Sequence, residues 1–132
     1  MVLIDHIVTV AEAAVVYPVG QLPPGTVGLS LDATLTYGSG GTSLKAWVQT
    51  SLDGGLTYFD IACFAYTTAT KRRICTLRGD TAVTTLATPG AAALADDTVV
   101  NGFVGAHVRV VLTSVGTYAG QTRLTIYADP KG

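Results

Sequence analysis

The segment Leu44–Ala65 constrains the fold most, because it predicts two β-strands joined by a tight turn. Small and apolar residues alternate with polar ones on both sides of Asp53-Gly54-Gly55-Leu56, which is typical of a β-hairpin. If Leu52 lies opposite Thr57, the core-facing pairs are Thr50–Phe59, Val48–Ile61, Ala46–Cys63 and Leu44–Ala65. The pairs that lie between these four then face the opposite, outward side of the hairpin.

The turn of this hairpin carries a recognisable spacing. Ser51, Asp53, Gly55 and Thr57 occur at alternate positions, and Tyr58 follows. This pattern resembles the Asp-box of sialidases and many other β-proteins, where tryptophan is usual in place of Tyr58. The resemblance implies that the aspartate accepts hydrogen bonds from the turn backbone and that the glycine takes a positive φ. We therefore expect a structural turn without a catalytic role.

Composition favours a β-rich domain. The 132 residues are enough for one domain that buries about two-thirds of its unfolded surface. The chain is 48% apolar and 13% charged, well below the usual charged fraction of about a quarter. Threonine, valine and glycine are abundant, whereas the residues that solvate helix surfaces are scarce. This balance predicts an all-β domain with part of its surface covered by neighbours.

Charge and the amino terminus disfavour two classes of partner. Eight Lys and Arg residues with a net charge of −1 cannot form a strongly basic face, so we expect no nucleic-acid binding. The start MVLIDHIVTV has no basic region, and Asp5 and His6 interrupt its apolar run. It reads as neither a secretion signal nor a membrane span. We expect an unprocessed protein made in the cytoplasm.

Further strands are predicted along the chain. Apolar and polar residues alternate cleanly over 27–37, and strand-like segments follow at 71–78, 82–86, 99–104, 107–114 and 122–128. A turn centred on Ala69 would pair the 71–78 strand with the hairpin, with Cys63 opposite Cys75, Ile61 opposite Leu77 and Asp60 opposite Arg78. Without a long helix, these strands predict an antiparallel two-sheet sandwich of about eight strands, jelly-roll-like in topology.

Residues 1–25 leave two alternatives open. They are strand-like without clean alternation, and Pro18, Pro23 and Pro24 interrupt any regular element. They form either a first strand and loop at the edge of the sandwich, or an arm that packs on a partner. In both cases residues 26–132 form a single β-sandwich domain.

Catalytic chemistry has little support. His6 and His107 are the only histidines, Glu12 is the only glutamate, and none lies in a local pattern that activates a nucleophile. We expect no enzyme, no cofactor and no metal. Cys63 and Cys75 are expected as reduced thiols, and they are too few for a zinc site. Asp96 and Asp97 with Asp80 could hold calcium, but a solvated loop pair is the commoner arrangement.

The outward face of the hairpin is the candidate interaction surface. It carries the only tryptophan and is too apolar to face bare water. With the neighbouring strand and the turn, the expected interface residues are Trp47, Lys45, Phe64, Ile74, Tyr58, Tyr66 and Arg72. Three covers are open: the amino-terminal segment, a neighbouring subunit of a larger assembly, or a sugar stacked on Trp47 and Tyr58.

Three stretches together resemble a class of proteins. Leu31–Gly55, Cys63–Ala69 and Gly116–Gly120 are similar to small proteins encoded among the structural genes of tailed bacteriophages and prophages. The resemblance implies a virion component, most simply a capsid decoration or cement protein that binds between capsid subunits. It also implies the major capsid protein or other virion proteins as partners, and self-association into a homo-oligomer. A neck or tail accessory protein and a carbohydrate-binding module are the alternatives.

Overall fold

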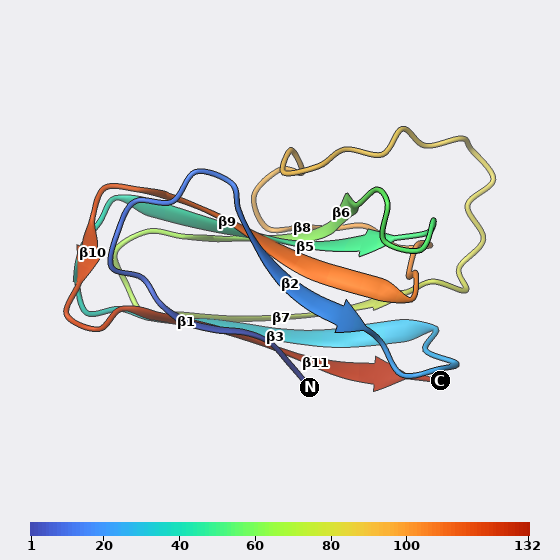
Figure 1. Cartoon of the computed structure of the whole chain (residues 1–132), viewed down its shortest axis with the longest axis horizontal. Helices are drawn as coiled ribbons and strands as arrows, with labels where there is room; N and C mark the ends of the chain where they lie inside the picture. The colour runs from blue at the N-terminus through green and yellow to red at the C-terminus, as the bar shows by residue number, and fades with distance from the viewer.

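Two antiparallel β-sheets pack face to face in the computed structural model, which describes residues 1–132 (Figure 1). The first sheet contains, in spatial order, β1 (Val2–Ile7), β11 (Arg123–Lys131), β3 (Gly28–Thr36) and β7 (Lys71–Arg78). The second contains β2 (Val15–Gln21), β9 (His107–Val115), β5 (Ser43–Ser51), β6 (Phe59–Tyr66) and β8 (Thr98–Val99). The short strands β4 (Ser39–Gly40) and β10 (Tyr118–Ala119) pair with each other at one end.

The strand order is that of a jelly roll. Apart from the three two-residue strands, the chain alternates between the sheets at every step except β5 to β6. The orders β1-β11-β3-β7 and β2-β9-β5-β6 result, with every pairing antiparallel. Two such sheets of four long strands define the jelly-roll arrangement. The predicted all-β sandwich is therefore confirmed.

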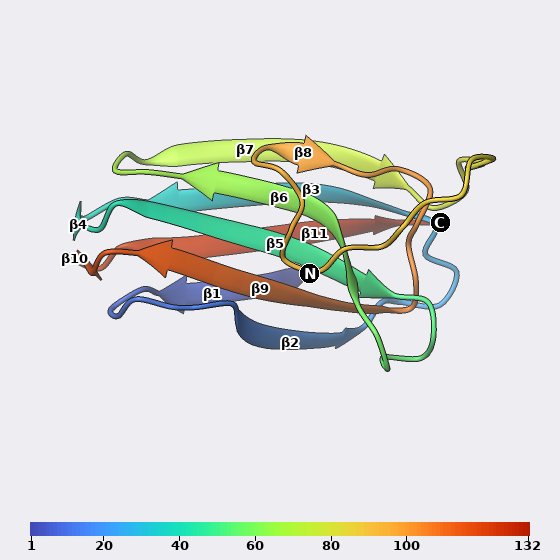
Figure 2. The same cartoon turned by 90° about the horizontal axis from the view of Figure 1, so that it is seen from above.

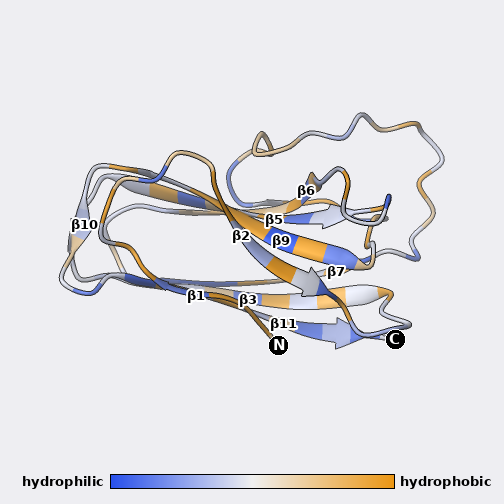
Figure 3. Cartoon of the chain, in the orientation of Figure 1, coloured by the Kyte–Doolittle hydropathy of each residue, from blue (hydrophilic) through white to orange (hydrophobic).

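The core lies between the sheets and follows the alternation of the sequence. In β3, the residues Leu29, Leu31, Ala33 and Leu35 are no more than 1% exposed, as the 27–37 pattern predicts. They pack against apolar residues of the neighbouring and facing strands, which include Leu44, Val48, Leu112, Leu124 and Ile126. The alternation is visible along β9 in Figure 3, where hydrophobic and hydrophilic residues succeed one another.

The register of the hairpin differs from the predicted one because β6 contains a β-bulge. Thr50 faces Phe59 as predicted, but Val48 faces Ala62, because Ile61 is an extra residue in β6. Beyond the bulge every residue of β6 changes face, so Phe64 and Tyr66 point into the core while Cys63 points outward. The bulge buries two aromatic side chains where the predicted register buries a cysteine and an alanine, which removes more apolar surface from water.

The predicted pairing of β6 with β7 is wrong. β7 crosses to the first sheet and pairs with β3, with Ile74 beside Asp32 and Leu77 beside Leu29. The edge of β6 at which β7 was expected is occupied by the chain between β7 and β9. There Asp60 N donates to Gly90 O, and Val100 N donates to Ile61 O. Cys63 and Cys75 consequently lie in different sheets, and Asp60 does not meet Arg78.

Residues 1–25 form edge strands of the sandwich. β1 pairs with β11 and β2 pairs with β9, so each sheet receives one edge strand from this segment. Leu3, Ile4, Val8 and Leu22 are buried in the core. Of the two alternatives for residues 1–25, the structure therefore has the edge strands and not the free arm.

The connection from β7 to β9 has little regular structure. The predicted strand at 82–86 is wrong, because these residues are exposed and have no strand beside them. The strand expected at 99–104 is reduced to β8. Residues 79–97, hereafter the 79–97 loop, pass over the outer side of the second sheet (Figures 1 and 2).

All regular elements of the chain are strands, so it forms no helix that could span a membrane.

Candidate partner-binding surface

Trp47 lies on the outer side of the second sheet and is covered by the protein's own chain. It is 6% exposed and packs with Cys63 and Val111 beneath Ala92 and Leu94. Its indole Nε1 donates a hydrogen bond to Leu94 O at 3.1 Å. The cover is thus the 79–97 loop and not the amino-terminal segment. The sequence did not indicate this cover, and it leaves no open face on Trp47.

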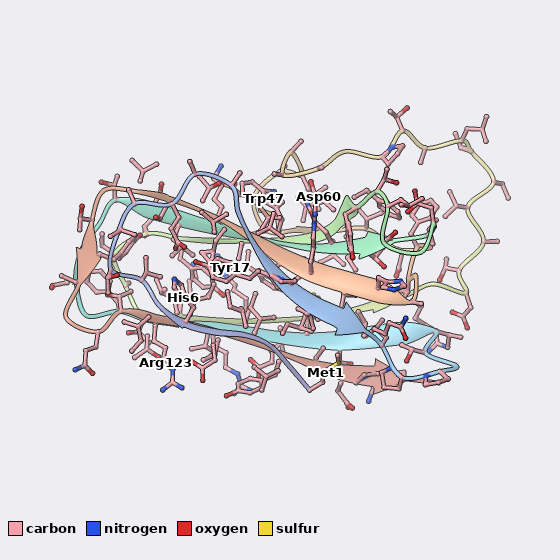
Figure 4. All side chains as sticks on the ribbon, viewed as in Figure 1. Met1, His6, Tyr17, Trp47, Asp60 and Arg123 are labelled. Atoms are coloured by element: carbon pink, nitrogen blue, oxygen red, sulfur yellow. The ribbon has the colours of Figure 1, made fainter.

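Asp60 fastens the loop above this tryptophan. Its Oδ1 accepts from Gln49 Nε2 and from Ala92 N, both at 2.8 Å. Its Oδ2 accepts from Ala93 N at 2.8 Å and from Leu94 N at 2.9 Å. The side chains of Trp47 and Asp60 rise from the second sheet toward the loop in Figure 4. One buried carboxylate therefore orders the backbone of residues 92–94.

The polar network continues to Tyr58. Gln49 Oε1 accepts a hydrogen bond from Arg109 Nε at 2.7 Å. The Arg109 guanidinium in turn lies over the Tyr58 ring, 4.2 Å from its centroid, in a cation–π contact. Tyr58 is half-buried and this face of its ring is occupied. Neither of the two aromatic residues proposed for sugar stacking has a free face on this side.

The predicted turn has the expected geometry. Asp53 Oδ1 accepts from Thr57 N at 2.9 Å and from the Ser51 hydroxyl at 2.7 Å, and Ser51 Oγ accepts from Gly55 N at 2.9 Å. Gly55 has φ of 93°. Hydrogen bonds from Thr57 hold the pKa of Asp53 far below its ordinary value. The prediction of a structural turn is confirmed.

The seven predicted interface residues do not form one surface. Phe64 and Tyr66 are inside the core, where the Tyr66 hydroxyl donates to Ala33 O at 2.8 Å. Ile74 and Arg72 lie on the outer face of the first sheet. Only Trp47, Lys45 and Tyr58 remain on the outer side of the second sheet. The β6 bulge and the crossing of β7 explain this separation, since both change which residues share a face.

The three aspartates considered for calcium do not gather. Each forms an ion pair with a different cation: Asp96 with Lys45 at 2.8 Å, Asp97 with Arg73 at 3.1 Å and Asp80 with Arg78 at 2.9 Å. No three His, Cys, Asp or Glu side chains come together in a group that could hold a metal. These carboxylates therefore attach the 79–97 loop to the two sheets.

The exposed part of the 79–97 loop is a feature that the strand pattern of the sequence does not predict. Residues 81–91 are all exposed, Leu86 completely and Val83 to 45%. Between the loop and the second sheet lies a hollow of about 440 Å³, whose apolar walls include Leu52, Phe59, Pro89, Leu94, Val100 and Phe103. The signal in the sequence is TAVTTLATPGAAALA at 81–95, which has no charged residue.

A second open surface lies on the outer face of the first sheet. Ile74 is 73% exposed and Tyr127 46%, and with Met1 they line a shallow hollow. The ion pairs Arg72–Asp32, at 2.7 Å, and Arg123–Asp5 lie on the same face. This surface mixes charged and apolar groups, whereas the loop surface is uncharged over residues 81–95.

Comparison with known proteins gives no relative of this chain. No family model, curated protein or solved structure matches it.

Proposed function

We propose that this chain is a structural, non-enzymatic component of a tailed-bacteriophage virion, a decoration protein that binds between capsid subunits through its 79–97 loop. The observation that carries the proposal is the loop itself, which is long, uncharged over 81–95, exposed at its tip and anchored at its base. Loops of this length without regular structure are uncommon and are usually either functional or disordered linkers, and this loop is held in place at its base.

The chemistry of the loop suits burial against another protein. Burying a charged group without a partner is costly, and residues 81–95 carry none. Leu86 and Val83 provide apolar surface whose removal from water would favour association. Because Asp60 and Trp47 already hold residues 92–94, less conformational freedom is lost when the loop binds.

Fold and resemblance both support a virion role. Jelly rolls are frequent among viral capsid proteins, although the fold alone does not define a function. The stretches that resemble phage structural proteins meet in space, since Tyr118 pairs with Gly40 and Ala119 with Ser39. In this proposal the partners are the major capsid protein or another virion protein, and further copies of the chain. Attachment at the neck or tail would use the same surface.

A carbohydrate-binding role is not favoured by any contact. Sugar binding by stacking needs an open aromatic face. Leu94 covers Trp47, and the Arg109 guanidinium lies over Tyr58. On the side of the second sheet, the loop is the surface that remains open.

Co-sedimentation with capsid shells of the phage that encodes the chain tests the proposal. We expect the wild-type protein to sediment with the shells and the double variant Val83→Asp, Leu86→Asp to lose at least tenfold in affinity. Ile74→Asp is the control, because it puts a negative charge on an exposed apolar residue of the first sheet. Shell binding that is lost in Ile74→Asp and retained in the loop variant would reject the loop as the docking surface.

A further inference from the structure

β7 ends the first sheet and has no strand on its outer side. Figure 2 shows it along one border of the molecule, with no strand beyond it. The other edge strands of the two large sheets are less suited to pairing: β8 has two residues, β2 contains Pro18, and both β1 and β2 have an irregular register. β7 keeps a continuous register with β3 over all eight of its residues and contains no proline. Neither the fold nor the proposed function uses this edge.

Three residues of β7 turn their backbone groups to the open edge. In an antiparallel sheet, alternate residues of a strand bond to the neighbour on each side. Gly79 N donates to Val27 O at 2.6 Å, which places the odd-numbered residues of β7 in the hydrogen bonds to β3. Arg78 faces the other way, because its N–H and C=O groups bond to residues 101 and 102. The remaining even-numbered residues, whose N–H and C=O groups have no protein partner, are Arg72, Ile74 and Thr76.

The side chains of this edge are apolar at the centre and charged around it. Ile74 is 73% exposed, more than any other large apolar side chain in a strand. Asp32 pairs with Arg72 at 2.7 Å, and Asp97 pairs with Arg73 at 3.1 Å. An incoming strand must avoid placing like charges opposite the cations of β7. These cations are four of the eight in the chain: Lys71, Arg72, Arg73 and Arg78.

We propose that β7 pairs antiparallel with β7 of a second copy of this chain, about a twofold axis beside Ile74. Only one register pairs the three open residues with one another. In it Ile74 lies opposite Ile74 of the second copy, and Arg72 lies opposite Thr76. Each of these pairs would exchange two backbone hydrogen bonds that water now provides. The two exposed isoleucines would lie side by side and remove apolar surface from water.

Charge selects the same register. With Ile74 opposite itself, no lysine or arginine of one β7 strand lies opposite a lysine or arginine of the other. A shift by two residues in one direction would place Arg73 opposite Arg73, and a shift in the other direction would place Arg72 opposite Arg78. A twofold pair uses the same surface on both copies. The edge is complementary to itself, which favours a second copy over an unrelated strand.

The pair would join the first sheets of two copies into one continuous sheet. The 79–97 loop lies over the outer side of the second sheet, so the loops of both copies would stay open. The inference therefore adds self-association through a separate surface to the proposed function. It does not depend on capsid binding.

Charge reversal at residue 74, measured by sedimentation equilibrium, tests the pairing. A residue that lies opposite itself is repelled in a dimer of one charged variant and attracted in a mixed dimer of opposite charges. We expect the wild type to dimerise, and Ile74→Lys and Ile74→Glu each to raise the dimer dissociation constant at least tenfold. An equimolar mixture of the two variants should recover dimerisation.

Tyr127→Lys and Tyr127→Glu are the matched controls. Tyr127 is an exposed residue of the same face, two strands away from the edge. Both variants should dimerise as the wild type does. Circular dichroism should show that all four variants are folded, because each replaces an exposed side chain.

Amide hydrogen exchange examines the edge itself. Raising the wild-type concentration should slow the exchange of the Arg72, Ile74 and Thr76 amides. The amides of Arg73 and Cys75, which donate within the first sheet, should exchange slowly at every concentration. A wild type that stays monomeric, charged variants that both still dimerise, or a mixture that stays monomeric would overturn the proposal.

Pairing and capsid docking can fail separately. None of these measurements uses capsid shells. Ile74→Asp should also be monomeric, yet it should still sediment with shells through its 79–97 loop.

Discussion

Asp60 shows how one side chain can organise a long segment without regular structure. Its carboxylate accepts three backbone N–H groups of residues 92–94 and one side-chain amide proton of Gln49. The neighbouring Trp47 supplies apolar contact and one further hydrogen bond to the same segment. From the sequence, Asp60 was expected opposite Arg78 in a cross-strand ion pair. No local pattern indicates that residues 92–94, about thirty positions further along the chain, pack on Asp60 instead.

Asp60→Asn should release the loop. An asparagine amide nitrogen cannot accept the backbone hydrogen bonds, so we expect the free energy of unfolding to fall by about 2–3 kcal/mol. Trp47 should lose its cover, and its fluorescence emission should move to longer wavelength. Urea unfolding followed by fluorescence measures both effects. Asp97→Asn is the control on the same loop, because its partly exposed pair with Arg73 contributes only about 0–1 kcal/mol.

Asp53 should make stability depend on pH in the acid range. Hydrogen bonds from Thr57 and Ser51 lower the pKa of Asp53 in the folded protein, whereas an unfolded aspartate titrates near 3.9. The stabilisation is therefore complete above about pH 4 and is lost as pH falls through the lower folded-state pKa.

Urea unfolding between pH 5 and pH 2 measures this effect. The stability of the wild type should fall more steeply with acid than that of Asp53→Asn, and Thr57→Val should lie between them because the backbone donor remains. Parallel curves for the wild type and Asp53→Asn would show that the turn aspartate does not titrate differently in the two states.

At the scale of the elements, local pattern predicted strands better than their partners. The alternation over 27–37 fixed the inward face of β3, and the Asp-box spacing fixed the turn. The β6 bulge had no such signal, since Ile61 and Ala62 are both apolar and either could face the core. The inserted residue turned Phe64 and Tyr66 inward, which removed two of the expected interface residues from the surface.

Deleting β1 tests how far residues 1–25 belong to the fold. Removal of residues 2–7 takes Leu3 and Ile4 from the core and exposes the edge of β11. Each large buried aliphatic side chain is worth about 2–5 kcal/mol, against a total stability of about 5–15 kcal/mol. We expect the truncated chain to lose cooperative thermal unfolding by circular dichroism. Val2→Thr, an exposed change in the same strand, should keep it.

For the whole molecule, the sequence predicted the class of fold but not how the strands share the two sheets. Short strands without a long helix indicate a sandwich, and the structure confirms it. Strands that are close in sequence, such as β6 and β7, lie in different sheets, while Val2 pairs with Tyr127 from the far end of the chain. Such distant pairings leave no local pattern. The candidate surface was missed for the same reason, because the loop covers Trp47 only after folding.

The absence of lysine and arginine from the 79–97 loop also determines which proteases can attack it. No lysine or arginine occurs between Arg78 and Arg109, so trypsin has no cleavage site in the most exposed segment of the chain. Exposed loop tips are ordinarily where folded proteins are nicked first. Digestion of the native protein by trypsin should therefore spare the loop, whereas elastase, which cuts after small apolar residues, should sever it.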